Sequence, residues 1–221
     1  MSVWALLVAA GTGERLGEER PKAFVRLGEL PLLAEPLRRL EDSGWIDAIV
    51  IAVPAGWEEP TILLAEELSA TKVAAAVTGG ATRAESVRTA LAEVPEDVVV
   101  ALVHDAARPL LTEDLIERVL APLSDGWDGV VPGLPLSDTV KRVRDGAIVE
   151  TVDRTGLYAV QTPQAFLAPV LRRGYAGDLA GATDCAALVE AAGGRVTVVE
   201  GDPRLVKVTT KADLELVASW L

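Results

Sequence analysis

Two glycines and two cations stand close together just after the first apolar run of the chain. The run 3–8 leads into Gly11 and Gly13, and Arg15 and Lys22 follow shortly afterwards. Glycine has no Cβ, so backbone N–H groups in such a turn can approach an anion closely. Two cations beside the turn, at the carboxyl end of a first parallel strand, would suit a triphosphate. We therefore predict a phosphate loop, although a bare Gly-x-Gly turn is equally compatible with a purely structural role.

The spacing of this loop separates it from two common nucleotide motifs. No Gly-Lys-Ser/Thr follows, so the loop is not of the Walker type. Leu16 stands where the dinucleotide fingerprint has its third glycine, and Pro21 interrupts the helix that should follow. A nicotinamide-dependent dehydrogenase is therefore disfavoured.

Composition excludes several other classes of protein. The 221 residues carry a formal net charge of −12, which repels nucleic acids and anionic membranes, so an anionic ligand needs a local basic pocket. One histidine and one cysteine disfavour a zinc site and Ser-His-Asp or Cys-His chemistry. We expect His104 to be a hydrogen-bonded core residue and Cys185 a small buried one. The early apolar run is too short to span a bilayer and lacks a preceding basic segment, so we expect a cytoplasmic protein.

Short β-rich apolar runs alternate with stretches of helical period, which predicts a single-domain (residues 1–221), doubly wound α/β fold with a mostly parallel sheet. Two predicted helices have apolar faces, one with Leu33, Leu37 and Leu40 and the other with Val87, Leu91 and Val94. Thr210 and Asp213 predict a capping box at the start of the last helix, ahead of the apolar residues Leu214, Val217 and Leu221. The predicted strands cover residues 3–8, 48–53, 73–77, 98–104, 129–132, 159–162 and 196–199.

One segment departs from this alternation. Residues 140–143 and 148–152 flank Asp145-Gly146, a dipeptide favoured in type I′ hairpin turns. This predicts a protruding β-arm at about residues 136–156. A two-stranded ribbon is marginal in water, so the arm should pack on the parent domain or on a second subunit.

Several blocks of the chain resemble, in order, the sugar-phosphate nucleotidyltransferases and, among them, the 2-C-methyl-D-erythritol 4-phosphate cytidylyltransferase family. The resemblance covers nearly the whole chain. The matching blocks are Ala9-Ala10-Gly11-x-Gly13-x-Arg15-x-Gly17 with Pro21-Lys22, Val103-His104-Asp105-Ala106-Ala107-Arg108-Pro109, Asp138-Thr139-Val140-Lys141, Thr151-Val152-Asp153-Arg154, Gln161-Thr162-Pro163-Gln164, Ala182-Thr183-Asp184 and Val206-Lys207-Val208-Thr209.

The resemblance implies transfer of a cytidylyl group from CTP to a small sugar-alcohol phosphate. Arg15 and Lys22 would neutralise charge on the α-phosphate, and Arg154 and Lys207 would hold the acceptor in line for attack. Mg²⁺ is expected, held mainly by the CTP phosphates, and no protein metal ligand is predicted. The implied CTP-binding residues are Ala9, Ala10, Gly11, Gly13, Lys22, Gly79, Gly80, Ser86 and Asp105. The implied acceptor-binding residues are Asp105, Arg108, Thr139, Arg154, Thr162, Thr183 and Lys207.

Some features leave alternatives open. Ala81 and Thr82 stand where the family commonly has acidic residues, so the sequence leaves open how these two positions affect selectivity for the base. The resemblance implies a homodimer in which the β-arm clasps the partner, and Arg154 acts in either its own or its neighbour's site.

The alternative functions are a ribitol 5-phosphate cytidylyltransferase, a more distant guanylyltransferase and a non-catalytic nucleotide-sensing module. The last is disfavoured by the presence of both Arg15 and Lys22.

Overall fold

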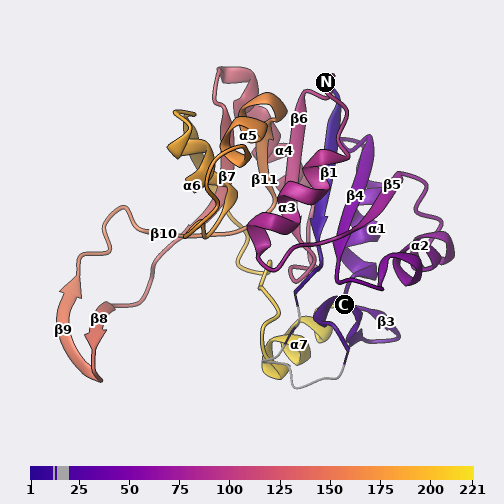
Figure 1. Ribbon diagram of the computed structural model, residues 1–221. Helices are drawn as coiled ribbons and strands as arrows, with labels where there is room; N and C mark the ends of the chain where they lie inside the picture. The colour runs from indigo at the N-terminus through magenta and orange to yellow at the C-terminus, as the bar shows by residue number, and fades with distance from the viewer. Residues whose placement is uncertain (12, 14–19) are drawn as a thin grey trace.

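The computed structural model describes residues 1–11, 13 and 20–221. A large sheet runs through the centre of the protein (Figure 1). Its hydrogen-bonded path is β10-β7-β11-β6-β1-β4-β5, and β12 pairs with β7. The strands of this sheet are β1 (Val3–Val8), β4 (Ala48–Val53), β5 (Val73–Thr78), β6 (Val100–Asp105), β7 (Gly129–Pro135), β10 (Tyr158–Val160), β11 (Gln164–Leu167) and β12 (Val196–Glu200).

Strand β1 is the parallel centre of the sheet. Leu6 of β1 is paired with Val50 of β4 on one side and with Val103 of β6 on the other. The pairs β4–β5 and β12–β7 are also parallel, whereas β10 and β11 run antiparallel to their neighbours. The predicted mostly parallel α/β sheet is therefore confirmed.

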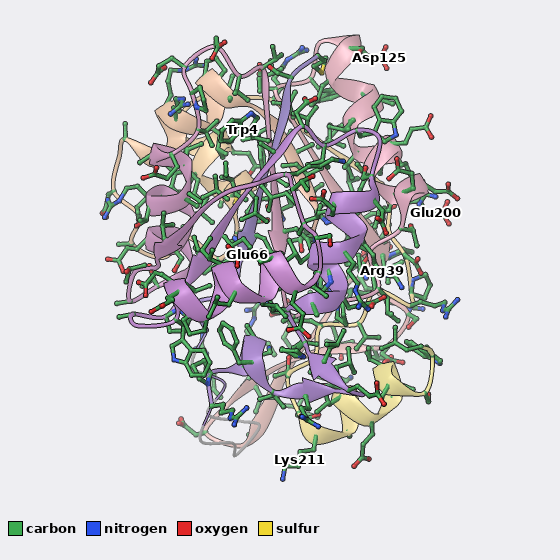
Figure 2. All side chains as sticks on the ribbon, turned by 90° about the vertical axis from the view of Figure 1, so that its right-hand side faces the viewer. Trp4, Arg39, Glu66, Asp125, Glu200 and Lys211 are labelled. Atoms are coloured by element: carbon green, nitrogen blue, oxygen red, sulfur yellow. The ribbon has the colours of Figure 1, made fainter. Side chains whose placement is uncertain are left out.

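Helices cover both faces of the sheet. Successive residues of a strand point to opposite faces, so the apolar residues of β1 pack against two separate layers of helices. Leu7 belongs to the apolar cluster beneath α1 (Ala34–Asp42), α2 (Glu58–Glu67), α4 (Glu113–Leu120) and α7 (Lys211–Ala218). Leu6 belongs to the cluster beneath α3 (Arg83–Ala92), α5 (Ala168–Tyr175) and α6 (Cys185–Ala191). Charged side chains such as those of Glu200 and Lys211 lie at the outside of the protein (Figure 2). Within the described ranges, no helix is both long and apolar enough to cross a membrane.

The predicted helix faces are largely confirmed. Leu37 and Leu40 of α1 are fully buried, and so is Val87 of α3. Thr210 and Asp213 form the predicted capping box at the start of α7. Helix α7 ends at Ala218, and the side chain of Leu221 beyond it is exposed.

The second half of the sheet differs from the prediction. The strand expected at 159–162 is β10, which ends at Val160, and the short buried strand β11 follows it. The predicted strand at 98–104 starts later, at Val100. Three further short elements were not predicted from the sequence: the antiparallel pair β2 (Arg26–Leu27) and β3 (Leu30–Pro31), and the 3₁₀ helix η2 (Lys22–Phe24).

The β-arm forms as predicted from β8 (Val140–Arg144) and β9 (Ala147–Val152). Asp145 and Gly146 both have positive φ, 48° and 78°, as the first and second central residues of a type I′ turn require. The arm projects away from the sheet and its helices (Figure 1). None of its residues, all of which are described, belongs to either apolar cluster, so the arm is not packed on its parent domain.

Candidate functional site

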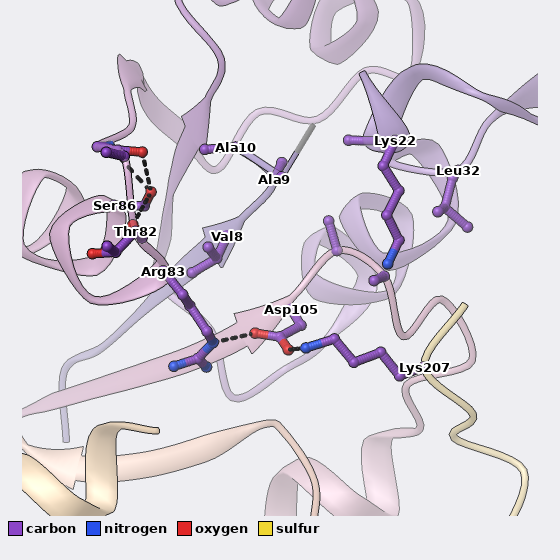
Figure 3. A pocket seen from close by; sticks show the side chains of 16 residues that line it. Val8, Ala9, Ala10, Lys22, Leu32, Thr82, Arg83, Ser86, Asp105 and Lys207 are labelled. Carbon is purple, nitrogen blue, oxygen red and sulfur yellow. Dashed lines mark hydrogen bonds and ion pairs between the residues drawn. The ribbon is translucent and has the colours of Figure 1, made fainter. Parts of the chain in front are cut away.

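A pocket of about 360 Å³ opens where β1 and β6 end at their carboxyl edge. Figure 3 shows side chains entering it from β1, from β6, from the start of α3, from η2 and from the segment before α7. This is the edge at which open α/β sheets bind ligands. Its lining consists of Val8, Ala9, Ala10, Gly11, Lys22, Ala23, Leu32, Gly80, Ala81, Thr82, Arg83, Ser86, Asp105, Ala106, Ala107 and Lys207.

The first wall of the pocket follows β1. Ala9, Ala10 and Gly11 contribute mainly backbone there because their side chains are small or absent. Gly13 has a φ of +74°, and a Cβ at this position would lie 2.6 Å from the Cβ of Lys22. Glycine thus allows the loop to approach the start of η2, where Lys22 extends into the pocket (Figure 3).

The second wall is the turn between β5 and α3. A Cβ on Gly79 would lie 2.4 Å from the Cβ of Ala10, so the two walls touch at these small residues. The Ser86 hydroxyl accepts a hydrogen bond from the Gly80 N–H (3.1 Å) and donates one to the Thr82 carbonyl (2.9 Å). Thr82 caps α3 through a capping box with Glu85, which gives this non-acidic residue a structural role in the turn.

Asp105, the last residue of β6, joins two basic side chains inside the pocket. Its Oδ1 accepts a hydrogen bond from Arg83 Nε (2.8 Å), and its Oδ2 accepts one from Lys207 Nζ (2.7 Å). Burial alone would raise the pKa of Asp105, but the charges of Arg83 and Lys207 hold that pKa below its ordinary value. Asp105 is therefore ionised at neutral pH.

The described lining is basic overall, in contrast to the whole chain. It contains three basic side chains, Lys22, Arg83 and Lys207, and one carboxylate, Asp105. The chain as a whole has a net charge of −12. A local excess of positive charge in an acidic protein is the arrangement that an anionic ligand needs.

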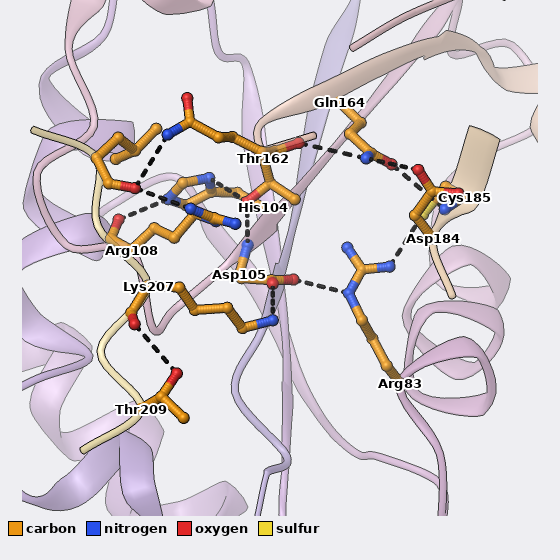
Figure 4. Close-up of polar contacts among 12 residues, drawn as sticks. Arg83, His104, Asp105, Arg108, Thr162, Gln164, Asp184, Cys185, Lys207 and Thr209 are labelled. Carbon is orange, nitrogen blue, oxygen red and sulfur yellow. Dashed lines mark hydrogen bonds and ion pairs between the residues drawn. The ribbon is translucent and has the colours of Figure 1, made fainter. Parts of the chain in front are cut away.

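Behind the pocket lies a second polar cluster around His104 (Figure 4). The imidazole is fully buried, and its Nε2 is 2.9 Å from the Arg108 carbonyl oxygen. Its Nδ1 is 3.2 Å from the Thr162 hydroxyl oxygen, which accepts a hydrogen bond from the Asp105 N–H (3.0 Å). Burial lowers the pKa of His104 to about 4, so the ring is neutral at pH 7. The expectation of a hydrogen-bonded core histidine is confirmed.

The structure places the predicted site residues in three groups. Eight of them line the pocket: Ala9, Ala10, Gly11, Lys22, Gly80, Ser86, Asp105 and Lys207. Gly13, Gly79, Arg108 and Thr162 lie outside the lining but contact it or support it. Arg15 lies outside the described residues. Thr139, Arg154 and Thr183 are exposed and do not line this pocket.

Arg154 lies at the base of the arm. Its Nη1 donates hydrogen bonds to the carbonyl oxygens of Leu136 and Ser137, with an N···O distance of 2.8 Å to Leu136. The side chain therefore braces the two strands of the arm where they leave the domain. Arg154 does not line the pocket of its own chain, and its contact with an acceptor stays a prediction.

Arg83 was not predicted as a site residue. This residue opens α3 directly beside the Gly79-Gly80 turn, and that position is the signal that could have identified it. Its Nη1 also donates to the sulfur of Cys185 (3.5 Å). Burial raises the pKa of the Cys185 thiol, so Cys185 is the buried neutral residue that was expected, with the guanidinium of Arg83 as an unexpected neighbour.

Comparisons with known proteins match nearly the whole chain to one family. A model of the 2-C-methyl-D-erythritol 4-phosphate cytidylyltransferase family matches residues 3–221. The protein of that name from Nocardia farcinica is 47% identical over 221 residues, which cover 100% of this chain and 94% of that protein. The crystal structure of 4-diphosphocytidyl-2C-methyl-D-erythritol synthase from Anaerococcus prevotii has a TM-score of 0.84 at 25% identity and covers 99% of this chain and 97% of that one. The structure of the Thermus thermophilus cytidylyltransferase has a TM-score of 0.79 at 32% identity, with coverages of 97% and 96%.

Proposed function

The chain belongs to the 2-C-methyl-D-erythritol 4-phosphate cytidylyltransferase family, and from this premise we propose how the pocket performs the family's reaction. The enzyme transfers a cytidylyl group from CTP to 2-C-methyl-D-erythritol 4-phosphate in isoprenoid precursor biosynthesis. Pyrophosphate leaves, and 4-diphosphocytidyl-2-C-methyl-D-erythritol is formed. The observation that carries the assignment of the site is the basic pocket between two glycine turns.

The two walls of the pocket bind different parts of CTP. The loop after β1 and Lys22 bind the triphosphate, and the Gly79-Gly80 turn meets the base through backbone groups. Lys22 stabilises the charge that develops on the α-phosphate. The attacking phosphate oxygen of the acceptor is already anionic at neutral pH, so positioning and charge neutralisation account for most of the catalysis. Arg15 is proposed to assist Lys22.

Lys207 is proposed to hold the phosphate of the acceptor. Its ammonium group lies in the pocket and is oriented by Asp105, which is itself fixed by Arg83. The side chain of Lys207 is still 44% exposed, so it can meet an incoming anion. An acceptor phosphate bound there faces the triphosphate that lies against Lys22.

Mg²⁺ is proposed as the cofactor, bound mainly by the CTP phosphates. Asp105 is the one carboxylate in the described lining, and both of its oxygens already contact cations. Among the described residues, no group of three or more His, Cys, Asp or Glu side chains could hold a metal ion. The donor set therefore fits an ion that arrives with the nucleotide. When bound, it would reduce the negative charge of the triphosphate and assist the departure of pyrophosphate.

We further propose a cytoplasmic homodimer built through the β-arms. Val143, Ile148 and Val149 of the arm are each more than half exposed, and a partner subunit would cover them. The arm also holds Arg154 and Thr139 away from their own pocket, which supports a role for them at the acceptor in the neighbouring pocket.

The first test is pyrophosphate release by the purified protein with CTP, Mg²⁺ and 2-C-methyl-D-erythritol 4-phosphate. Parallel reactions contain ribitol 5-phosphate, or no acceptor. Fast release with the methylerythritol phosphate alone supports the proposal. Faster turnover of ribitol 5-phosphate would move the acceptor, and no release with either would remove the enzymatic assignment.

The shared site is tested by mixing two inactive variants, Lys22→Ala and Arg154→Ala. In a mixed dimer, one pocket has both defects and the other has neither, provided that Arg154 acts across the interface. Activity should therefore return on mixing. If Arg154 acts in its own pocket, every pocket keeps one defect and the mixture stays inactive.

A further inference from the structure

The segment formed by residues 201–208 carries Lys207 into the pocket. It lies between β12 and α7, and it forms neither helix nor strand. Its position therefore depends on hydrogen bonds to other parts of the domain. The second half of the segment is bonded to the loop formed by residues 105–108. The first half is held by a residue from another part of the chain.

Gln161 binds the start of this segment with both ends of its side-chain amide. Its Nε2 donates to the Asp202 carbonyl oxygen (2.9 Å), and its Oε1 accepts from the Asp202 N–H (2.9 Å). A backbone carbonyl can only accept and a backbone N–H can only donate, so the two bonds fix the orientation of the amide. Gln161 is only 6% exposed. The backbone of Asp202 is thus bound at two points by a buried side chain.

Gly201 leaves room for this amide. A Cβ at position 201 would lie 2.4 Å from Oε1 of Gln161 and 3.2 Å from the backbone carbonyl carbon of Gly133. The Gly201 N–H donates to the Gly133 carbonyl in β7 (3.0 Å). The close approach of the segment to Gln161 and to β7 therefore depends on a residue without a side chain.

The backbone of Gln161 belongs to the root of the arm. The residue follows β10, the strand by which the chain returns from the arm to the sheet. Its N–H donates to the carbonyl of Pro132 in β7 (2.8 Å), the strand that leads out to the arm. Gln161 lies outside the described lining of the pocket. Its side chain connects the root of the arm to the segment that carries Lys207.

We propose that Gln161 is a positioning residue for the acceptor. Its amide fixes the start of the segment 201–208, so that Lys207 is held against Asp105 and presented to the acceptor phosphate. This proposal rests on the role of Lys207 given under the proposed function. It adds a supporting residue behind the acceptor contacts that the family resemblance implies and leaves those contacts as they are.

The two bonds between Gln161 and Asp202 are tested first, without any substrate. Gln161→Met keeps an unbranched side chain but has no amide. Hydrogen exchange followed by NMR should show the Asp202 amide exchanging at least about tenfold faster in this variant, relative to the amide of Leu6 in the centre of β1. An unchanged relative rate at Asp202 would overturn the proposal, whether or not the enzyme is active on the proposed acceptor.

Kinetics test the effect on the acceptor. Gln161→Met should lower kcat/KM for 2-C-methyl-D-erythritol 4-phosphate by about tenfold, because Lys207 is less often in its productive position. The dissociation constant for CTP, measured by calorimetry without acceptor, should change by less than about twofold, since the nucleotide is proposed to lie on the two glycine turns. An equal loss of CTP binding, or an unchanged kcat/KM, would overturn the positioning role.

Gly201→Ala tests the same contact from the other side. Its methyl group should displace the amide of Gln161 and lower kcat/KM for the acceptor by about tenfold. In the Gln161→Ala background the same change should lower kcat/KM by less than about threefold, because the atoms that would collide are gone. Equal losses in the two backgrounds would show that the two residues act independently and would overturn the proposal.

Thr61→Val is the control for a general loss of stability. The buried Thr61 hydroxyl donates to the Trp57 carbonyl at the start of α2. Helix α2 packs against β5, which lies at the other end of the sheet from β10. This variant should leave kcat/KM unchanged whatever its effect on Tm. If it lowers kcat/KM as much as Gln161→Met does, the effect is one of stability and the positioning role is refuted.

Discussion

Replacing Asp105 by asparagine should destabilise the protein far more than replacing Lys207 by methionine, although both residues belong to one ion-pair chain. The side chain of Asp105 is 8% exposed, and that of Arg83 is 24% exposed. Removing the carboxylate leaves a largely buried guanidinium whose Nη2 has no hydrogen-bond partner among the described residues. Breaking a buried pair in this way costs about 3–5 kcal/mol, and the asparagine oxygen keeps the loss near the lower figure because it can still accept one N–H.

The Lys207→Met variant lacks this penalty. Asp105 keeps its bond to Arg83, and the lost ion pair involves a lysine that is 44% exposed. Pairs at this level of exposure contribute about 0–1 kcal/mol. For a chain of this size, about 1 kcal/mol changes Tm by roughly 2–4 °C, so we expect a loss of about 6–12 °C for Asp105→Asn and at most about 4 °C for Lys207→Met. Both variants should lose activity.

Thermal unfolding followed by circular dichroism at pH 7 measures the difference between these variants. The pH dependence provides a further check. Because the folded-state pKa of Asp105 is lowered from 3.8, its contribution is fully present above that pH and is lost as the pH falls through the folded-state value. The gap between wild type and Asp105→Asn should therefore be constant between pH 8 and 5. Equal losses of Tm in the two variants, or a gap that closes above pH 5, would refute the reasoning.

Three further predictions concern turnover, nucleotide binding and acid stability. Lys22→Ala should lower kcat much more than it weakens CTP binding, because its contact strengthens as charge develops in the transition state; steady-state kinetics with CTP varied will show this. Gly79→Ala should raise KM for CTP, since the new methyl group would collide with Ala10. Gly177→Ala should behave as wild type, because its new methyl group would lie 3.9 Å from the Gly174 carbonyl oxygen, an ordinary contact distance. His104 has a folded-state pKa of about 4 instead of 6.5, so its contribution is present above pH 6.5 and lost as the pH falls toward 4. Wild type should lose about 2 kcal/mol more than His104→Gln between pH 7 and 4.5 in urea unfolding, and equal losses would count against a buried neutral imidazole.

Local patterns were sufficient to predict the parallel half of the sheet. The strands at 3–8 and 48–53 are continuous apolar runs, because helices cover both of their faces. Local patterns predicted the strands of the antiparallel half less well. Gln161 and Gln164 are polar but buried, since their side chains bond to backbone groups of distant segments, such as the Asp202 carbonyl. A pattern based on apolar residues cannot locate strands that border such a segment.

The candidate site was predicted where one short segment provides several groups, and missed where the contact joins distant segments. The glycine turns and Lys22 could be recognised from neighbouring residues alone. Asp105 was assigned to the site, but its pairing with Arg83 and Lys207 joins positions 22 and 102 residues away. Such pairings depend on the tertiary fold. The same holds for the exposed position of Arg154, which depends on the direction in which the arm leaves the domain.

The isolation of the arm has a consequence for the order of folding. Because none of its residues belongs to either apolar cluster, the domain can complete its core while the arm is still disordered. If the arms form the proposed dimer, their ordering is coupled to the meeting of two already folded subunits, and that step becomes slower as the protein is diluted. Refolding should then show a first phase that is independent of protein concentration and a later one, accompanied by recovery of activity, that depends on it.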